Sequence, residues 1–197
     1  MPLKTETIAV ELHPHAPVWI AMARAETDAL KAELGNLLLR VEHMGSTAIP
    51  GIAAKPIIDL MPIARDEPSL DAMETGVVKL GYEWLGEFGI PGRRYCRKSD
   101  PASGKRTFQL HCFAHGAPEI DRHLAFRDYL RAFPDIAKEY ETEKRRAAAL
   151  HPDDTLAYNA AKNDWIKRTE RDAFAWWRGA GKRVDTFQTE SVRHHVL

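Results

Sequence analysis

The spacing of apolar residues in the first half of the chain predicts a helix followed by a small sheet. Apolar residues recur at helical spacing over residues 17–34, which is typical of a helix that packs one face on a core. Short apolar runs at residues 37–43 and 56–63 predict two strands joined by a loop rich in glycine and proline. A second helical pattern follows at residues 68–80 and ends at a glycine, and residues 82–85 are expected to form an edge strand.

A basic hairpin is expected to complete this sheet. Residues 93–98 read Arg-Arg-Tyr-Cys-Arg-Lys, and a polar turn then leads into a return strand at residues 106–114. Period-2 alternation in the return strand places Gln109, His111 and Phe113 on one face. A histidine in this position is either a hydrogen-bonded structural residue or a ligand that opens into a site.

The second half of the chain is expected to be helical. Helical spacing covers residues 121–132 and 135–150, and a long helix is expected from about 153 to 177. Two pairs, Tyr140 with Lys144 and Tyr158 with Lys162, each lie four residues apart, so each pair shares one helical face. These lysines belong either to an ordinary solvated face or to a set that converges on an anion.

These patterns predict an α+β fold with a small mixed sheet, flanking helices and a helical C-terminal half. Residues 1–177 are expected to form one domain, with a sheet core at about 37–114 and a helical half at about 119–177, and residues 178–197 are expected to form a polar tail.

Composition and charge narrow the class of protein. The chain has 197 residues, with 28 Lys plus Arg and 28 Asp plus Glu, so it lacks the basic excess typical of proteins that bind nucleic acid. The two cysteines, Cys96 and Cys112, have no metal-type spacing and predict a reducing compartment. No apolar stretch has the length of a signal peptide or a membrane span, so a cytoplasmic location is expected.

The loop between the first two strands carries the candidate chemistry. Gly45, Ser46 and Thr47 offer backbone N–H groups and hydroxyls to an anion, because glycine allows a close approach. Asp59 stands in the following apolar run, where a carboxylate is costly to bury unless it is paired or binds a metal. The sequence therefore predicts a pocket that holds Ser46 and Asp59, with His111 opening into it.

The residues of this segment resemble a known family. Residues 42–51 read Glu-His-Met-Gly-Ser-Thr-Ala-Ile-Pro-Gly, residues 54–59 read Ala-Lys-Pro-Ile-Ile-Asp, and together they resemble the signature of the GrpB-like family. The resemblance implies a nucleotidyltransferase fold and an association with dephospho-CoA kinases. In that fold a Gly-Ser turn precedes Asp-x-Asp or Asp-x-Glu, but this chain has Met61 where the second acid is expected.

The resemblance also implies roles for individual residues. Asp59 and His111 would be catalytic and would bind Mg²⁺ or Mn²⁺, with Glu42 and His43 as candidates for the missing carboxylate role. The residues expected to bind phosphate or ligand are Gly45, Ser46, Thr47, Lys55, Arg94, Arg97, Arg127, Lys144 and Lys162. At least one arginine of the basic hairpin is expected to point towards the pocket.

Two functions stay open on this evidence. One is a metal-dependent nucleotidyl or phosphoryl transferase, which the retained Gly-Ser-Thr, Lys55 and Asp59 favour. The other is a non-catalytic ligand-binding or accessory module, which Met61 favours. Either would bind a small phosphorylated ligand or nucleotide.

Overall fold

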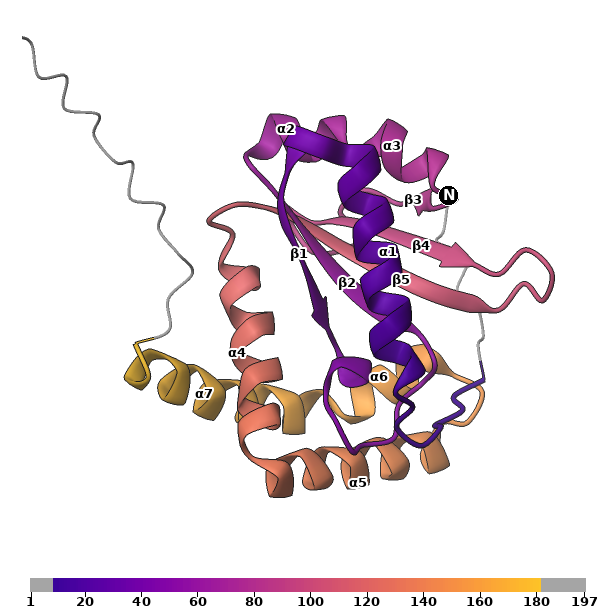
Figure 1. Cartoon of the computed structure of the whole chain (residues 1–197). Helices are drawn as coiled ribbons and strands as arrows, with labels where there is room; N and C mark the ends of the chain where they lie inside the picture. The colour runs from indigo at the N-terminus through magenta and orange to yellow at the C-terminus, as the bar shows by residue number, and fades with distance from the viewer. Residues whose placement is uncertain (1–8, 182–197) are drawn as a thin grey trace, which may run out of the picture.

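The computed structural model describes residues 9–181, and its elements follow the predicted order (Figure 1). The strands are β1 (Leu38–Met44), β2 (Ile58–Ala64), β3 (Glu83–Trp84), β4 (Arg94–Ser99) and β5 (Arg106–Ala114). The helices are α1 (Val18–Leu34), α2 (Glu67–Ala72), α3 (Glu74–Lys79), α4 (Pro118–Ala132), α5 (Pro134–Leu150), α6 (Thr155–Ala161) and α7 (Asn163–Gly179). Two single 3-10 turns, η1 (Gly35–Leu37) and η2 (Ser46–Ala48), flank β1.

The five strands form one mixed sheet in the order β1-β2-β5-β4-β3. β2 and β5 are parallel neighbours, whereas the other three pairings are antiparallel. The register brings the candidate residues together: Met44 of β1 lies opposite Asp59 of β2, and Asp59 lies beside Gln109 of β5. The fold is α+β, as the apolar patterns predicted.

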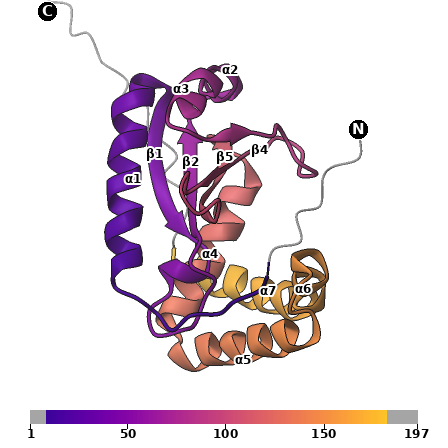
Figure 2. The ribbon, with the colours of Figure 1, turned by 90° about the vertical axis from the view of Figure 1, so that its right-hand side faces the viewer.

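Helices cover both faces of the sheet (Figure 2). On one face, α1, α2 and α3 pack against a core that includes Leu60, Leu110 and Cys112. On the other face, α4 and α7 pack against Met61 and Phe113. Alternate residues of each strand therefore face different layers, and α5 and α6 cross below the end of the sheet.

The structure corrects two of the predicted helices. The helix expected at 68–80 is split into α2 and α3 at Met73, which is fully buried. At the start of α2, the Asp66 carboxylate accepts a hydrogen bond from the backbone N–H of Ser69. The helix expected at 153–177 is broken between α6 and α7 at Lys162, whose backbone caps both helices. Apolar spacing continues across both breaks, so it concealed them.

The expected domain boundary at residue 177 falls near the end of the last described helix. Most of the predicted tail, residues 182–197, lies outside the described residues, and α7 extends slightly into the expected tail, to Gly179. Within residues 9–181, no helix combines the length and the apolar character needed to cross a membrane.

Candidate functional site

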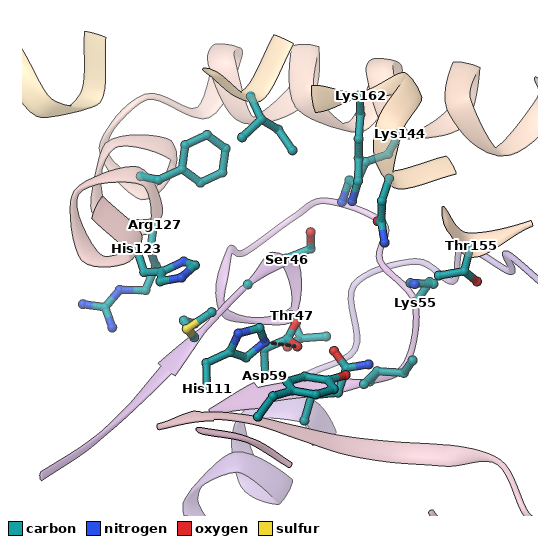
Figure 3. A pocket seen from close by; sticks show the side chains of 18 of the residues that line it. Ser46, Thr47, Lys55, Asp59, His111, His123, Arg127, Lys144, Thr155 and Lys162 are labelled. Carbon is teal, nitrogen blue, oxygen red and sulfur yellow. Dashed lines mark ion pairs between the residues drawn. The ribbon is translucent and has the colours of Figure 1, made fainter. Parts of the chain in front are cut away.

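A cavity of about 670 Å³ lies between the sheet and the C-terminal helices (Figure 3). One wall is formed by the Gly45–Thr47 loop, Asp59 of β2 and His111 of β5. Lys144 of α5 and Lys162 at the α6–α7 junction extend into the cavity from the opposite, helical wall. Its size is within the range of small-molecule sites.

Gly45 allows the loop backbone to rest directly on the Asp59 carboxylate. Gly45 has a φ of 70°, which favours glycine, and a Cβ atom there would lie 2.3 Å from Asp59 Oδ2. The glycine and the acid of the motif are therefore packed against each other, and Ser46 begins the 3-10 turn η2 beside them. This arrangement places loop backbone, hydroxyl and carboxylate in one corner of the cavity.

Asp59 and His111 meet across the β2–β5 pair. The Nε2 atom of His111 lies 3.8 Å from Asp59 Oδ1, and both side chains are partly exposed to the cavity. The pocket predicted from the sequence, with Ser46, Asp59 and His111 together, is present in the structure.

The residues around Asp59 do not fit a two-metal centre. Met61, at the expected second acid, is fully buried among Ile63 and Phe113. The part of the chain that the structure describes contains no group of three His, Cys, Asp or Glu side chains able to hold a metal ion. One carboxylate suits at most a single Mg²⁺ or Mn²⁺ whose other ligands are phosphates and water.

Glu42 and His43 do not supply the missing carboxylate function. Glu42 lies opposite Met61 in the β1–β2 register, but Arg40 and Arg127 bind its carboxylate, with N–O distances of 3.1 and 2.9 Å. His43 lies opposite Leu60, on the other face, and its Nε2 is 3.0 Å from Thr47 Oγ1. Burial lowers the pKa of His43 to about 4.

Three lysines converge on the cavity from different segments. Lys55 comes from the loop before β2, Lys144 from α5 and Lys162 from the α6–α7 junction (Figure 3). Burial lowers the pKa of Lys55 to about 8 and the pKa of Lys144 to about 7, and the nearby charge of Lys162 contributes to both shifts. Burial also lowers the pKa of Lys162 to about 8. None of the three forms an ion pair within residues 9–181.

Aromatic rings hold these lysines in place. Lys144 Nζ lies 4.8 Å from the centre of the Tyr140 ring, and Lys162 Nζ lies 4.4 Å from that of Tyr158. The Tyr/Lys pairs predicted to share a helical face therefore make cation–π contacts. Lys144 also donates a hydrogen bond to the carbonyl of Ala53, which lies in the loop between β1 and β2. The helical wall is thus tied to this loop.

The basic hairpin sends one of its two predicted arginines to the cavity. Arg97 lines it, as does Arg127 of α4. Arg94 does not, because residues three apart in a strand face opposite sides, and its guanidinium binds Asp71 of α2 at 2.6 Å on the other face. The assignment of Arg94 to the ligand site was wrong.

Sequence reasoning missed a second group of lining residues. Arg93 is almost fully buried, and its guanidinium lies 3.4 Å from His111 Nδ1. Tyr95 stands opposite His111 in the β4–β5 register, and His123 of α4 lies beyond His111 with a ring separation of 5.8 Å. Burial lowers the pKa of His123. Arg93 and Tyr95 belong to the basic run at residues 93–98, which the sequence analysis singled out. The sequence did not show that their side chains point into the cavity.

Comparison with known proteins identifies relatives of this chain. Residues 9–172 match the family profile described as GrpB protein. UPF0157 protein YqkA of Bacillus subtilis is 41% identical over 170 residues, which cover 86% of this chain and 49% of YqkA. A dephospho-CoA kinase of Mycolicibacterium paratuberculosis is 31% identical over 204 residues, covering 91% of this chain and 50% of that protein. The chain thus spans about half the length of these two relatives.

Solved structures agree with the sequence matches. The crystal structure of conserved protein GrpB from Enterococcus faecalis superposes with a TM-score of 0.79 at 41% identity, covering 85% of this chain and 99% of that one. The Cid1 poly(U) polymerase is far more distant, with a TM-score of 0.48 at 11% identity.

Proposed function

Because this chain belongs to the GrpB protein family and carries three lysines in its cavity that form no ion pair within residues 9–181, we propose that it binds a phosphorylated, nucleotide-like ligand there. The observation that supports this proposal most strongly is the convergence of Lys55, Lys144 and Lys162 on the Gly45–Thr47 loop (Figure 3).

The energetic argument rests on the cost of burying ammonium groups. A buried lysine without a carboxylate is unfavourable in its charged form, and this cost is what lowers the pKa values of the three lysines. A polyphosphate would reverse the cost, since its oxygens accept charge-assisted hydrogen bonds from several ammonium groups at once. Loop amides at Gly45 and Ser46 would add donors to the same anion.

Asp59 supports a second candidate, metal-dependent nucleotidyl or phosphoryl transfer. A carboxylate beside bound phosphate is repulsive unless a cation lies between them. Asp59 would hold a single Mg²⁺ or Mn²⁺, which would neutralise phosphate charge, while the lysines position the ligand. His111, 3.8 Å from Asp59, would hold or move a proton. Buried Met61 instead favours a binding or accessory module, a role compatible with the dephospho-CoA kinase relative.

Calorimetric titration with inorganic tripolyphosphate and with ATP tests the proposal. Lys144→Met should weaken binding of both about 10- to 100-fold, because a charge-assisted hydrogen bond contributes about 1.5–3 kcal/mol. The matched control is Lys138→Met, an exposed lysine on the same helix, which should leave affinity unchanged. Equal effects of the two substitutions would show that only the overall charge is sensed.

The same titration of Asp59→Asn, with and without Mg²⁺, separates the two candidates. If Asp59 holds a metal, the substitution should abolish any gain in affinity that Mg²⁺ produces. For a module that binds the anion alone, Asp59→Asn should leave affinity intact or improve it, since a negative charge beside phosphate is removed. Metal-independent binding that survives Asp59→Asn would exclude the transferase.

A further inference from the structure

The loop between β3 and β4 places an aromatic ring at the cavity. Phe88 lines the cavity and is 38% exposed. One side of its ring is stacked on Tyr95, with ring centres 5.1 Å apart and an interplanar angle of 20°. The two stacked rings form a platform on the sheet wall, with exposed Phe88 over buried Tyr95, whereas Lys144 and Lys162 stand on the helical wall.

The backbone at Phe88 is strained. Its φ of 44° is the only positive φ at a residue other than glycine in the described part of the chain. Such a conformation is unfavourable for a phenylalanine and persists only where the surroundings enforce it. Glycine would adopt it freely, yet the position carries a large ring. A strained, exposed aromatic residue at a cavity points to a use for the ring itself.

Buried Arg93 enforces the loop conformation. Its guanidinium donates to the Phe88 carbonyl at 2.7 Å and to the Glu87 carbonyl at 3.3 Å, and it lies over the Tyr95 ring at 4.9 Å. The Glu87 carboxylate in turn accepts the Gly92 amide at 2.6 Å. The platform is therefore pre-organised before any ligand arrives, which lowers the entropic cost of binding.

The platform is connected to the candidate reactive groups. The edge of Tyr95 meets His111, with ring centres 5.4 Å apart at 71°, and His111 lies beside Asp59. A planar group stacked on Phe88 would thus be separated from the His111–Asp59 pair by the rings of Phe88 and Tyr95. Its phosphates would extend across the cavity towards the lysines.

We infer that Phe88 and Tyr95 form the stacking site for the base of a nucleoside polyphosphate whose phosphates bind Lys55, Lys144 and Lys162. This inference rests on the proposed function and narrows its ligand from phosphorylated compounds to nucleotides. Base–aromatic stacking tolerates every base, because each presents a π-face. The platform therefore selects for a base over inorganic polyphosphate and does not discriminate strongly among bases.

The test uses the full chain with Phe88→Gly, titrated with ATP and with inorganic tripolyphosphate. Loss of the ring should weaken ATP binding about 5- to 100-fold and leave tripolyphosphate affinity within about twofold. Glycine adopts this φ without steric strain, so the unfolding temperature should not fall. Phe88→Tyr, which keeps the ring, should retain ATP affinity. Phe133→Ala, which removes an equally exposed ring that does not line the cavity, is the control.

The outcomes are distinct. A wild-type protein that binds neither ligand would overturn the proposed function and this inference with it. If the wild type binds tripolyphosphate but binds ATP no more tightly than Phe88→Gly does, the base platform is wrong while the anion site stands. Equal weakening of both ligands by Phe88→Gly would show that the loop only shapes the cavity, which also overturns the inference.

Discussion

At the scale of single residues, the contact between Gly45 and Asp59 is the most constrained point of the site. Any side chain at residue 45 would meet Asp59 Oδ2 at 2.3 Å and Asp59 Cβ at 3.0 Å. The backbone at Gly45, with a φ of 70° and a ψ of −171°, adds a second, independent cost for any other residue. The two costs can be separated, because Gly51 has a similar φ of 78° and nothing within 4 Å of its Cβ position.

We expect Gly45→Ala to destabilise the fold more than Gly51→Ala. The Gly51 substitution should cost about 1 kcal/mol for the backbone alone. The Gly45 substitution should cost about 1–3 kcal/mol more, because the carboxylate must be displaced. Chemical denaturation measures both, and the excess should shrink when Asp59 is also changed to alanine. Equal losses at the two glycines would mean that the loop does not rest on Asp59.

At the scale of elements, Arg127 connects α4 to β1. Its guanidinium donates to Glu42 Oε2 at 2.9 Å and to the His43 carbonyl at 3.0 Å, and it also pairs with Asp128. The side chain is only 12% exposed. The contact therefore fixes the helical half against the edge of the sheet, and it explains why Glu42 is held away from a metal role.

Removing this connection should be costly. Arg127→Met should lower the free energy of unfolding by about 2 kcal/mol or more, since it leaves the partly buried Glu42 carboxylate short of a partner. Arg145→Met is the matched change on α5, where the arginine pairs with Glu141 one turn away on an exposed surface. It should cost less than about 0.5 kcal/mol. Similar losses in urea denaturation would contradict the role assigned to Arg127.

At the scale of the whole molecule, the lysine cluster links folding and binding to pH in opposite directions. Burial lowers the pKa of Lys144 from 10.5 to about 7, and those of Lys55 and Lys162 from 10.5 to about 8. Between these values the unfolded chain binds more protons than the native one, so the lysines make stability rise with pH from about 7 to about 10.5. Below pH 7 their cost is present in full.

This linkage predicts opposite slopes for stability and for ligand affinity. Lys144→Met should reduce the rise in unfolding free energy with pH by up to about 1.4 kcal/mol per pH unit between pH 7 and 10, whereas Lys138→Met should not. Tripolyphosphate affinity should fall as pH rises from 7 to 9.5, with proton uptake detectable by calorimetry in two buffers of different ionisation heat. Affinity that is constant or rises over this range would exclude neutral lysines from the site.

The sequence alone determined the elements and the site motif of this protein. Apolar periodicity located the five strands and most of the helices, because burial of one face acts over a few residues and leaves a local pattern. The Gly45-Ser46 turn and Asp59 could be joined in one pocket for a similar reason, since they lie at the two ends of one loop between adjacent strands. The alternation of β5 likewise oriented His111 correctly.

Only the tertiary structure decided which charges face the cavity. Period-2 alternation already places Arg94 and Arg97 on opposite faces of their strand, but only the packing of the sheet shows that the face of Arg97 meets the cavity. Glu42 is paired with an arginine 85 residues away, and Lys144 with a carbonyl 91 residues away. Such contacts depend on how distant elements pack, and no local pattern encodes them. The convergence of Lys55, Lys144 and Lys162 is therefore a property of the folded chain.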